Sequence, residues 1–284
     1  MSKISIIVFI LAFKEKPWAP LIALSKQTLK PDKIVIVAGY PSACVEKFPK
    51  IKSIDCIVIP PNLKFSVGER IGIALTIAFK RYQVNSYDYV VRLDEDFYFD
   101  ERFLEDNIRA GYDLVGCHGA MIMKSDKLIR VLKGRWAISP MDDVLVIDLF
   151  RASNCSVLPW SWVRPPLYLR YPRDTFSRGI MFGVELYRNG YPLINLVLDV
   201  MNKLIFSRII RKLSYRKMKT VAVIGMLIGY IVALLRKEKK SNLAIMLTEF
   251  YKVTSIMESY KTITKELRLI LSNKFSFYKR MKVK

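Results

Sequence analysis

Strand-like and helix-like segments alternate through the first hundred residues, and this alternation limits the folds open to the chain more than any other feature. Short apolar runs occupy residues 4–13, 33–38, 56–59 and 87–93. Apolar side chains recur at helical spacing over residues 17–29 and 66–82. This alternation is typical of a doubly wound, mostly parallel sheet, in which ligands bind beyond the carboxyl ends of the strands. We therefore expect an α/β domain at this end of the chain.

The later sequence first continues this pattern and then loses it. Residues 113–123 and 144–149 read as further strands, at a mixed edge of the sheet. A helix is expected after Asp174, closed by the pair Asn189-Gly190, which commonly ends helices. Beyond that point helical patterns alone remain. The sequence thus predicts an α/β domain over residues 1–195 and an all-helical region over residues 196–284.

The four cysteines give a prediction about redox state. Cys44, Cys56, Cys117 and Cys155 are widely spaced and form no C-x-x-C pair. This spacing indicates neither a disulfide framework nor a zinc site, so we expect reduced structural thiols of a protein that faces the cytosol.

Basic side chains are concentrated in the last third of the chain. Of 47 Lys and Arg and 25 Asp and Glu in all, residues 201–284 hold 20 basic and 4 acidic side chains. A cationic tail on a nearly balanced body favours contact with a polyanion, either anionic lipid or nucleic acid. Residues 221–235 form an uncharged, mostly apolar run inside this tail. Such a run suits lipid better than a solvated nucleic-acid arm, so nucleic acid is the less favoured partner.

The apolar run and its surroundings predict attachment to a membrane surface. As a helix, residues 221–235 would be about 22 Å long, shorter than the roughly 30 Å hydrocarbon core. Basic residues flank the run on both sides, which fits a peripheral position or a short insertion at the cytoplasmic, anionic face. Residues 243–271 have the spacing of a basic amphipathic helix. The alternative is a helix packed on the catalytic domain with a solvated basic face.

Three consecutive acidic residues, Asp94, Glu95 and Asp96, follow the fourth predicted strand directly. Carboxylates two residues apart in extended backbone project to the same side. Asp94 and Asp96 could thus hold Mg²⁺ or Mn²⁺, and the cation would neutralise a diphosphate. The alternative is an acidic turn in which Asp96 or Asp100 caps a following helix.

Taken in order, these segments resemble the family 2 glycosyltransferases of the GT-A fold. The resemblance covers roughly residues 3–115, and more weakly the stretch to about residue 195. It is carried by Gln27-Thr28 before Pro31, by Arg70 with Gly72, and by the Leu93-Asp94-Glu95-Asp96 cluster. It implies a GT-A-like fold and the transfer of a sugar from a nucleotide-sugar donor, with inversion at the anomeric carbon.

The resemblance also implies roles for individual residues. Asp94 and Glu95 would lie at the donor, Asp96 would contact the metal together with Asp94, and Arg70 would bind the donor phosphates. The alternative for Arg70 is a surface ion pair with Glu69 or another neighbour. Two positions depart from the family pattern, because Ala38 follows the second strand where an aspartate is common, and Ile71 stands where an asparagine is common.

An inverting transfer requires one general base, and a carboxylate opposite the leaving group is sufficient. By the resemblance, Asp174 fits this role because it precedes a helix that ends in a glycine. The alternative is that Asp174 caps that helix. Glu185 is the reserve candidate, and Asp142 and Asp143 are candidates on the acceptor side or members of an acidic loop.

The sequence therefore predicts a metal-assisted glycosyltransferase that acts on a sugar, lipid-linked or protein acceptor at a membrane. Two other classes remain open. One is a catalytically silent relative that binds a nucleotide, suggested by Ala38 and Ile71. The other is a nucleic-acid-binding protein that uses the basic tail.

Overall fold

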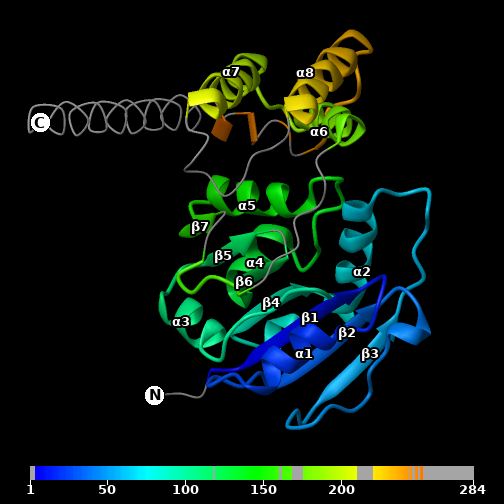
Figure 1. The fold of residues 1–284 in the computed structure, drawn as a ribbon, viewed down its shortest axis with the longest axis vertical. Helices are drawn as coiled ribbons and strands as arrows, with labels where there is room; N and C mark the ends of the chain where they lie inside the picture. The colour runs from blue at the N-terminus through cyan, green and yellow to red at the C-terminus, as the bar shows by residue number, and fades with distance from the viewer. Residues whose placement is uncertain are drawn as a thin grey trace, which may run out of the picture. The chain divides into compact units, whose positions relative to one another are not determined.

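The chain divides into two compact units, Met1–Pro172 and Arg173–Lys284, which we call the sheet unit and the helical unit. The computed structural model describes residues 4–117, 119–159, 162–167, 175–209, 220–242, 244, 247–248 and 250–251. Figure 1 shows the strands in the sheet unit and helices in the helical unit. The boundary between the units lies before the helix predicted after Asp174. The sequence assigns this helix to the first domain, but in the structure it belongs to the helical unit.

The sheet unit is built on a seven-stranded sheet with the order β3-β2-β1-β4-β6-β5-β7. The α/β class predicted from the sequence is confirmed. Neighbouring strands run parallel except where β6 pairs with β4 and with β5. The predicted strand at residues 113–123 is a hairpin of two strands, which produces the mixed edge. The strands are β1 (Ile6–Ala12), β2 (Lys33–Ala38), β3 (Ile54–Val58), β4 (Tyr89–Asp94), β5 (Leu114–Cys117), β6 (Ala120–Lys124) and β7 (Val157–Pro159).

Helices cover both faces of the sheet, and this explains why β1 is apolar at every position. Alternate residues of β1 enter two separate cores. Ile6, Val8 and Ile10 pack with α1 and α3, while Ile7 and Phe9 pack with α2, α4 and α5. These helices are α1 (Trp18–Ser25), α2 (Val67–Arg81), α3 (Phe103–Arg109), α4 (Ser125–Leu132) and α5 (Asp142–Ala152), with short 3₁₀ turns η1 (Pro41–Ala43) and η2 (Val84–Ser86).

The predicted strand at residues 144–149 is wrong, because this segment forms the middle of α5. A short apolar run has no periodicity that separates a buried strand from a buried helix. Asp142 and Asp143 occupy the first turn, where negative charge favours a helix. Val146, Ile147 and Phe150 then face the sheet core at helical spacing.

The prediction of four reduced cysteines is wrong for one pair. Cys44 and Cys56 form a disulfide with a Cα–Cα distance of 5.7 Å. Cys44 directly follows η1 in the connection between β2 and β3. Cys56 lies in β3, which pairs with β2. Because the chain folds back between them, their separation in sequence does not predict their distance in space. Cys117 and Cys155 are not part of a disulfide.

The helical unit is held together by close backbone contact. It contains α6 (Phe176–Arg188), α7 (Leu193–Ile209) and α8 (Thr220–Leu235). A β-carbon on Gly179 or Gly183 of α6 would collide with backbone oxygens of α8, and one on Gly225 or Gly229 of α8 would collide with those of α6. Glycine alone permits this approach. None of the helices that the structure describes is long and apolar enough to cross a bilayer.

Candidate active site

The candidate site lies where the strand order of the sheet reverses. From β1, the chain adds β2 and β3 on one side and then places β4 on the other side. β4 pairs with β1 in parallel, and Leu11 lies opposite Asp94 at the carboxyl ends of both strands. Doubly wound sheets bind ligands at such a reversal, outside the carboxyl ends of the strands. The structure therefore brings the acidic triplet to the expected edge.

A buried arginine holds two carboxylates at this edge. Arg92 projects from the middle of β4 and is 3% exposed. One terminal nitrogen, Nη2, donates to Oδ1 of Asp94 at 3.3 Å, and the other, Nη1, lies 3.3 Å from Oδ2 of Asp142. The indole Nε1 of Trp136 also donates to Oδ2 of Asp142, at 2.8 Å, and its ring lies 5.5 Å from the guanidinium carbon. Arg92 thus connects the end of β4 to the start of α5.

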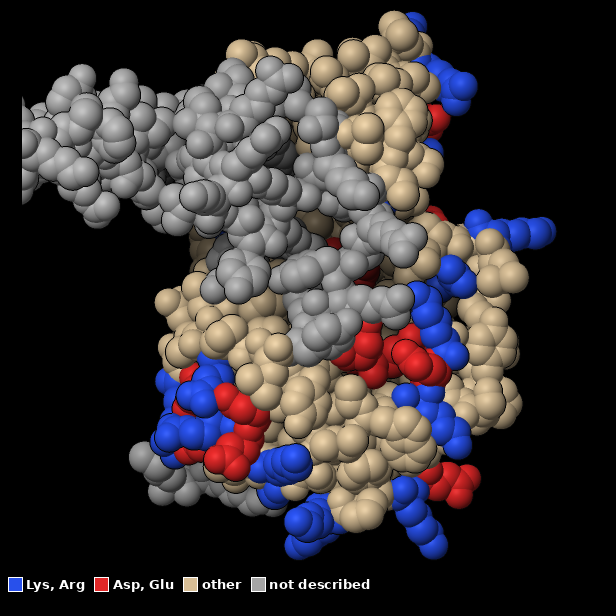
Figure 2. All heavy atoms as spheres, viewed as in Figure 1, with Lys and Arg blue, Asp and Glu red and all other residues tan. Residues whose placement is uncertain are grey.

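The site carries more negative charge than Arg92 neutralises. Desolvation by the surrounding protein raises the pKa of Asp94 although part of its side chain stays exposed, Arg92 opposes that rise, and the charges of Asp96 and Asp143 add to it. Burial likewise raises the pKa of Asp142 to about 7, again opposed by Arg92 and increased by Asp143. Carboxylates with raised pKa values at a strand end are typical of functional sites. Figure 2 shows carboxylates gathered beside α2 on the face in view, bordered by Lys and Arg side chains.

Asp96 lies in the turn after β4, close enough for its charge to raise the pKa of Asp94, and carboxylates are ligands that a hard divalent cation prefers. The Asp94 side chain is 34% exposed, so it is open to solvent although Arg92 holds one of its oxygens. Within the described ranges, no three His, Cys, Asp or Glu side chains are grouped so that they could hold a metal ion. Mg²⁺ commonly takes one or two carboxylates and completes its shell with water and substrate phosphate. The residues present fit a cation held in this way.

Glu95, the middle acidic residue, has a contact within the protein. Its Oε2 accepts from the backbone N–H of Lys14 at 3.0 Å and of Glu15 at 3.4 Å. Burial raises the pKa of Glu95, and these hydrogen bonds oppose the rise. Glu95 therefore ties the segment after β1 to the end of β4, and its predicted contact with a donor stays a prediction.

Arg70 lies in the first turns of α2. The predicted alternative, an ion pair with Glu69, is not what the structure records, because the Glu69 carboxylate accepts from the backbone N–H of Ser66 in a capping box. Arg70 Nε reaches the Ser66 carbonyl oxygen at 3.4 Å. Gly68 allows the close approach of residues 139–142, since a β-carbon there would lie 3.0 Å from Oδ1 of Asp142.

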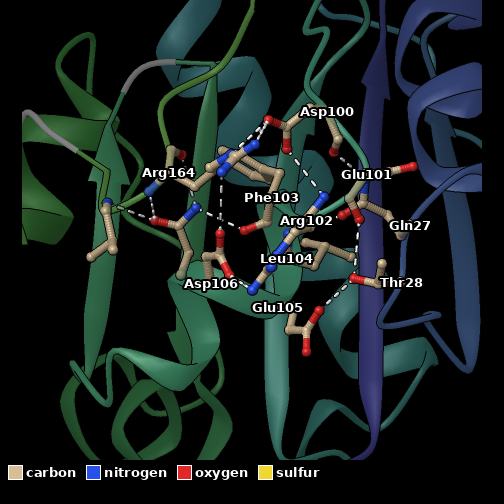
Figure 3. A network of polar contacts seen from close by, with 12 residues as sticks. Gln27, Thr28, Asp100, Glu101, Arg102, Phe103, Leu104, Glu105, Asp106 and Arg164 are labelled. Carbon is tan, nitrogen blue, oxygen red and sulfur yellow. Dashed lines mark hydrogen bonds and ion pairs between the residues drawn. The ribbon is translucent and has the colours of Figure 1, made fainter.

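The Gln27-Thr28 pair stabilises the loop that follows the acidic triplet (Figure 3). Buried Gln27 donates from Nε2 to the carbonyl oxygen of Asp100 at 2.5 Å and accepts at Oε1 from the backbone N–H of Leu104 at 2.9 Å. The Thr28 hydroxyl donates to Glu105 at 2.6 Å. These contacts join the end of α1 to the start of α3, so the role of this pair is structural.

A second set of contacts in the same network holds residues 162–167 against α3 (Figure 3). Arg164 Nε donates to Oδ2 of Asp100 at 2.6 Å, and its Nη1 lies 3.6 Å from Asp106. Asn107 Oδ1 accepts from the backbone N–H of Val163 at 2.8 Å. This chain segment is therefore fixed next to the loop that begins at the acidic triplet.

The predicted base, Asp174, lies outside the described residues. The N-cap of α6 is Thr175, whose hydroxyl oxygen accepts from the backbone N–H of Arg178 at 3.2 Å. The alternative that Asp174 caps this helix is therefore wrong. Glu185 of α6 is 8% exposed and pairs with Arg188 at 3.1 Å. It is a buried ion-pair partner within the helical unit.

Sequence reasoning missed the central residue of the site. Arg92 stands inside a strand whose other members are apolar up to Asp94, and a charged side chain in a buried strand requires a partner. That observation alone could have identified Arg92. The contacts of Arg92 with Asp142 and Trp136 could not be predicted from the sequence, because they depend on where α5 packs.

Comparisons with known proteins add little to this description. No protein-family model matches the sequence, and no curated protein matches it. The crystal structure of TarS from S. aureus is similar, with 14% sequence identity and a TM-score of 0.46, over 92% of this chain and 55% of the TarS chain. This chain thus spans about half the length of TarS. Likeness at this level carries no argument about activity, so a function must be argued from the residues of the chain itself.

Proposed function

We propose that this protein is a metal-assisted, inverting glycosyltransferase of the GT-A fold, similar to family 2, that uses a nucleoside diphosphate sugar. The observation that carries the proposal is the position of Asp94 and Asp96. Asp94 ends β4 at the reversal of strand order and Asp96 lies in the turn after it, in a site with an excess of carboxylates. The sequence resemblance over residues 3–115 supports the same reaction class.

The residues of the sheet unit have separate roles in this proposal. Asp94 lies at the ribose and diphosphate of the donor, and Asp96 completes the protein's share of the metal ligands. Arg70, at the start of α2, binds the phosphates. The bound Mg²⁺ or Mn²⁺ supplies charge that stabilises the departing nucleoside diphosphate. Arg92 holds Asp94 in position through a hydrogen bond to its Oδ1.

Proton transfer in this proposal belongs to one carboxylate. Asp174 accepts the proton of the acceptor hydroxyl while that oxygen attacks the anomeric carbon from the side opposite the diphosphate. One base is sufficient because inversion proceeds in a single displacement. Its support is the resemblance alone.

The reaction is tested by incubating the pure protein with a panel of nucleotide sugars, Mn²⁺ and candidate acceptors. We expect product with the inverted anomeric configuration, observed by NMR. Asp96→Asn should reduce turnover by about 100-fold or more, since it removes charge from the metal site. Asp126→Asn is the matched control, because Asp126 lies on α4 and its side chain is 68% exposed.

The same assay separates the active enzyme from a silent relative. Single-turnover conditions should give product in proportion to enzyme. Nucleotide binding with no product at any acceptor would instead identify a binding protein, and turnover unaffected by Asp96→Asn would contradict the assigned chemistry.

We place the enzyme at the cytoplasmic face of a membrane, held by its helical unit, with a lipid-linked or envelope-destined acceptor. The basic, apolar composition of residues 201–284 supports this placement. The Cys44–Cys56 disulfide opposes it, because disulfides are rare in the cytosol. Thiol labelling of the protein directly after cell lysis decides the point, since labelling of both cysteines fits a cytosolic location and protection of both contradicts it.

A further inference from the structure

One face of α8 is apolar and exposed along the whole helix. The exposed side chains recur at intervals of three and four residues, which places them in one stripe. Their exposed fractions lie between 39% and 76%. We call this set the α8 stripe, and it consists of Val221, Ile224, Ile228, Ile231 and Leu235.

The opposite face of α8 is fixed against the rest of the helical unit. Val223, Met226 and Tyr230 are buried in its core, which includes Leu196 and Val200 of α7. The paired glycines of α6 and α8 add backbone contact. Because a β-carbon at any of these glycines would collide with the neighbouring helix, α8 cannot rotate to bury its stripe. Within the part of the helical unit that the structure describes, the stripe therefore faces away from α6 and α7.

Charge surrounds the stripe but does not interrupt it. α8 contains no charged residue between Thr220 and Leu235. Directly after it, Arg236, Lys237 and Lys239 are exposed. The sequence before α8 adds Arg216, Lys217 and Lys219. An apolar helix face with cations at both ends complements the interface of an anionic bilayer, where acyl chains lie beneath negative headgroups.

We propose that α8 lies in the plane of an anionic bilayer and inserts the α8 stripe among the acyl chains, while the basic residues at its ends contact the headgroups. This inference rests on the membrane attachment proposed above and assigns it to a defined surface. Because α6 and α8 are packed through glycines, they would meet the membrane as one rigid pair.

A fluorescent reporter tests the insertion directly. Ile228→Trp places an indole in the stripe, and Ile77→Trp places one on α2 of the sheet unit at a site of similar exposure. Each protein is mixed with phosphatidylglycerol vesicles whose acyl chains are brominated. We expect quenching of Ile228→Trp well beyond that of the wild-type chain, and no added quenching of Ile77→Trp.

Charge substitution gives the second arm of the experiment. Wild-type protein should sediment with phosphatidylglycerol vesicles and keep part of this binding at about 0.5 M salt, where purely electrostatic contacts are screened. The double variant Ile224→Glu with Ile228→Glu should lower the vesicle-bound fraction at high salt by at least about 10-fold. Leu63→Glu with Ile77→Glu is the matched control, since both residues are exposed apolar side chains of the sheet unit.

Three results would overturn the inference. The first is an unquenched Ile228→Trp on bound vesicles, which would assign binding to the basic tail. The second is a stripe variant that binds like the wild type. The third is a dimer, detected by light scattering, that the stripe variant converts to monomer. None of these measurements involves nucleotide, so nucleoside diphosphate binding without vesicles shows separately whether the proposed chemistry stands.

Discussion

The two units of the protein differ in the contacts that hold their elements together. In the sheet unit, polar side chains hold the site, with Arg92 between two carboxylates and Gln27 between two backbone segments. In the helical unit, α6 and α8 pack backbone against backbone at paired glycines, which have no side chains to keep them apart. A contact made by side chains can be weakened in steps, whereas a backbone contact through glycine is lost as soon as any side chain is added. The two units should therefore respond differently to substitution.

The largest effect is expected at the glycines. Gly183→Val places side-chain atoms against the backbone of Met226 and Tyr230, so α6 and α8 must separate. We expect a loss of about 3 kcal/mol or more in the free energy of unfolding of the helical unit. All four tryptophans lie before residue 173. Urea unfolding followed by helical circular dichroism should therefore shift strongly, and the tryptophan signal should shift much less.

Ser177→Val is the matched control for this substitution. It places the same valine side chain at an exposed position of α6. Its unfolding should stay close to that of the wild type. Equal effects of the two substitutions would show that the glycines are not the source of the packing.

An effect of similar size is expected at the buried arginine. Arg92→Met leaves Asp142 buried without its cation, which should destabilise the sheet unit by about 3–5 kcal/mol. The double variant with Asp142→Leu removes both charges and should recover more than half of this loss. Tryptophan fluorescence in urea measures each member of the cycle. Simple additivity of the two single effects would contradict the coupling.

The pH dependence of stability should show the burial of Asp142. Its pKa is raised from 3.8 to about 7 in the folded chain, so between these values the folded state keeps a proton that the unfolded state has lost. The contribution of this group to stability is therefore largest at low pH, and falls as the pH rises from about 4 to 7. We expect Asp142→Asn to remove this fall, which stays below about 4 kcal/mol. Urea unfolding of both proteins at several pH values measures it.

The smallest effects are expected in the network of Figure 3. Gln27→Met leaves the buried N–H of Leu104 without its acceptor, which should cost about 2 kcal/mol. Thr28→Val removes an exposed hydrogen bond to Glu105 and should cost less than about 1 kcal/mol. Thermal unfolding ranks the two. The reverse order would show that burial does not set the strength of these contacts.

The sequence predicts the central sheet well and its periphery less well. β2 was placed at its observed bounds, because an apolar, branched run between proline and glycine has few other interpretations. α5 was mistaken for a strand, because its apolar run is short and its helical character comes from packing on the sheet. The Cys44–Cys56 disulfide depends on the path of a connecting loop, which no local pattern encodes.

The residues of the candidate site also differ in whether local sequence or tertiary packing determines their position. The position of Asp94 and Asp96 at the end of β4 could be predicted because the end of that strand is itself predictable, while their role stays a prediction. Arg92 could have been found from its burial in that strand. Asp142 is a candidate from the sequence, but its pairing with Arg92 depends on tertiary packing, at the close approach of residues 139–142 to Gly68.

The most direct test of the account is calorimetric titration of the pure protein with nucleoside diphosphates, with and without Mn²⁺. The account predicts that one of them binds at least about 10-fold more tightly with the metal, and that Asp96→Asn abolishes this difference while Asp126→Asn keeps it. Binding that is equally tight without metal, or a metal effect that survives in Asp96→Asn, would contradict the claim that these carboxylates hold a cation at a diphosphate.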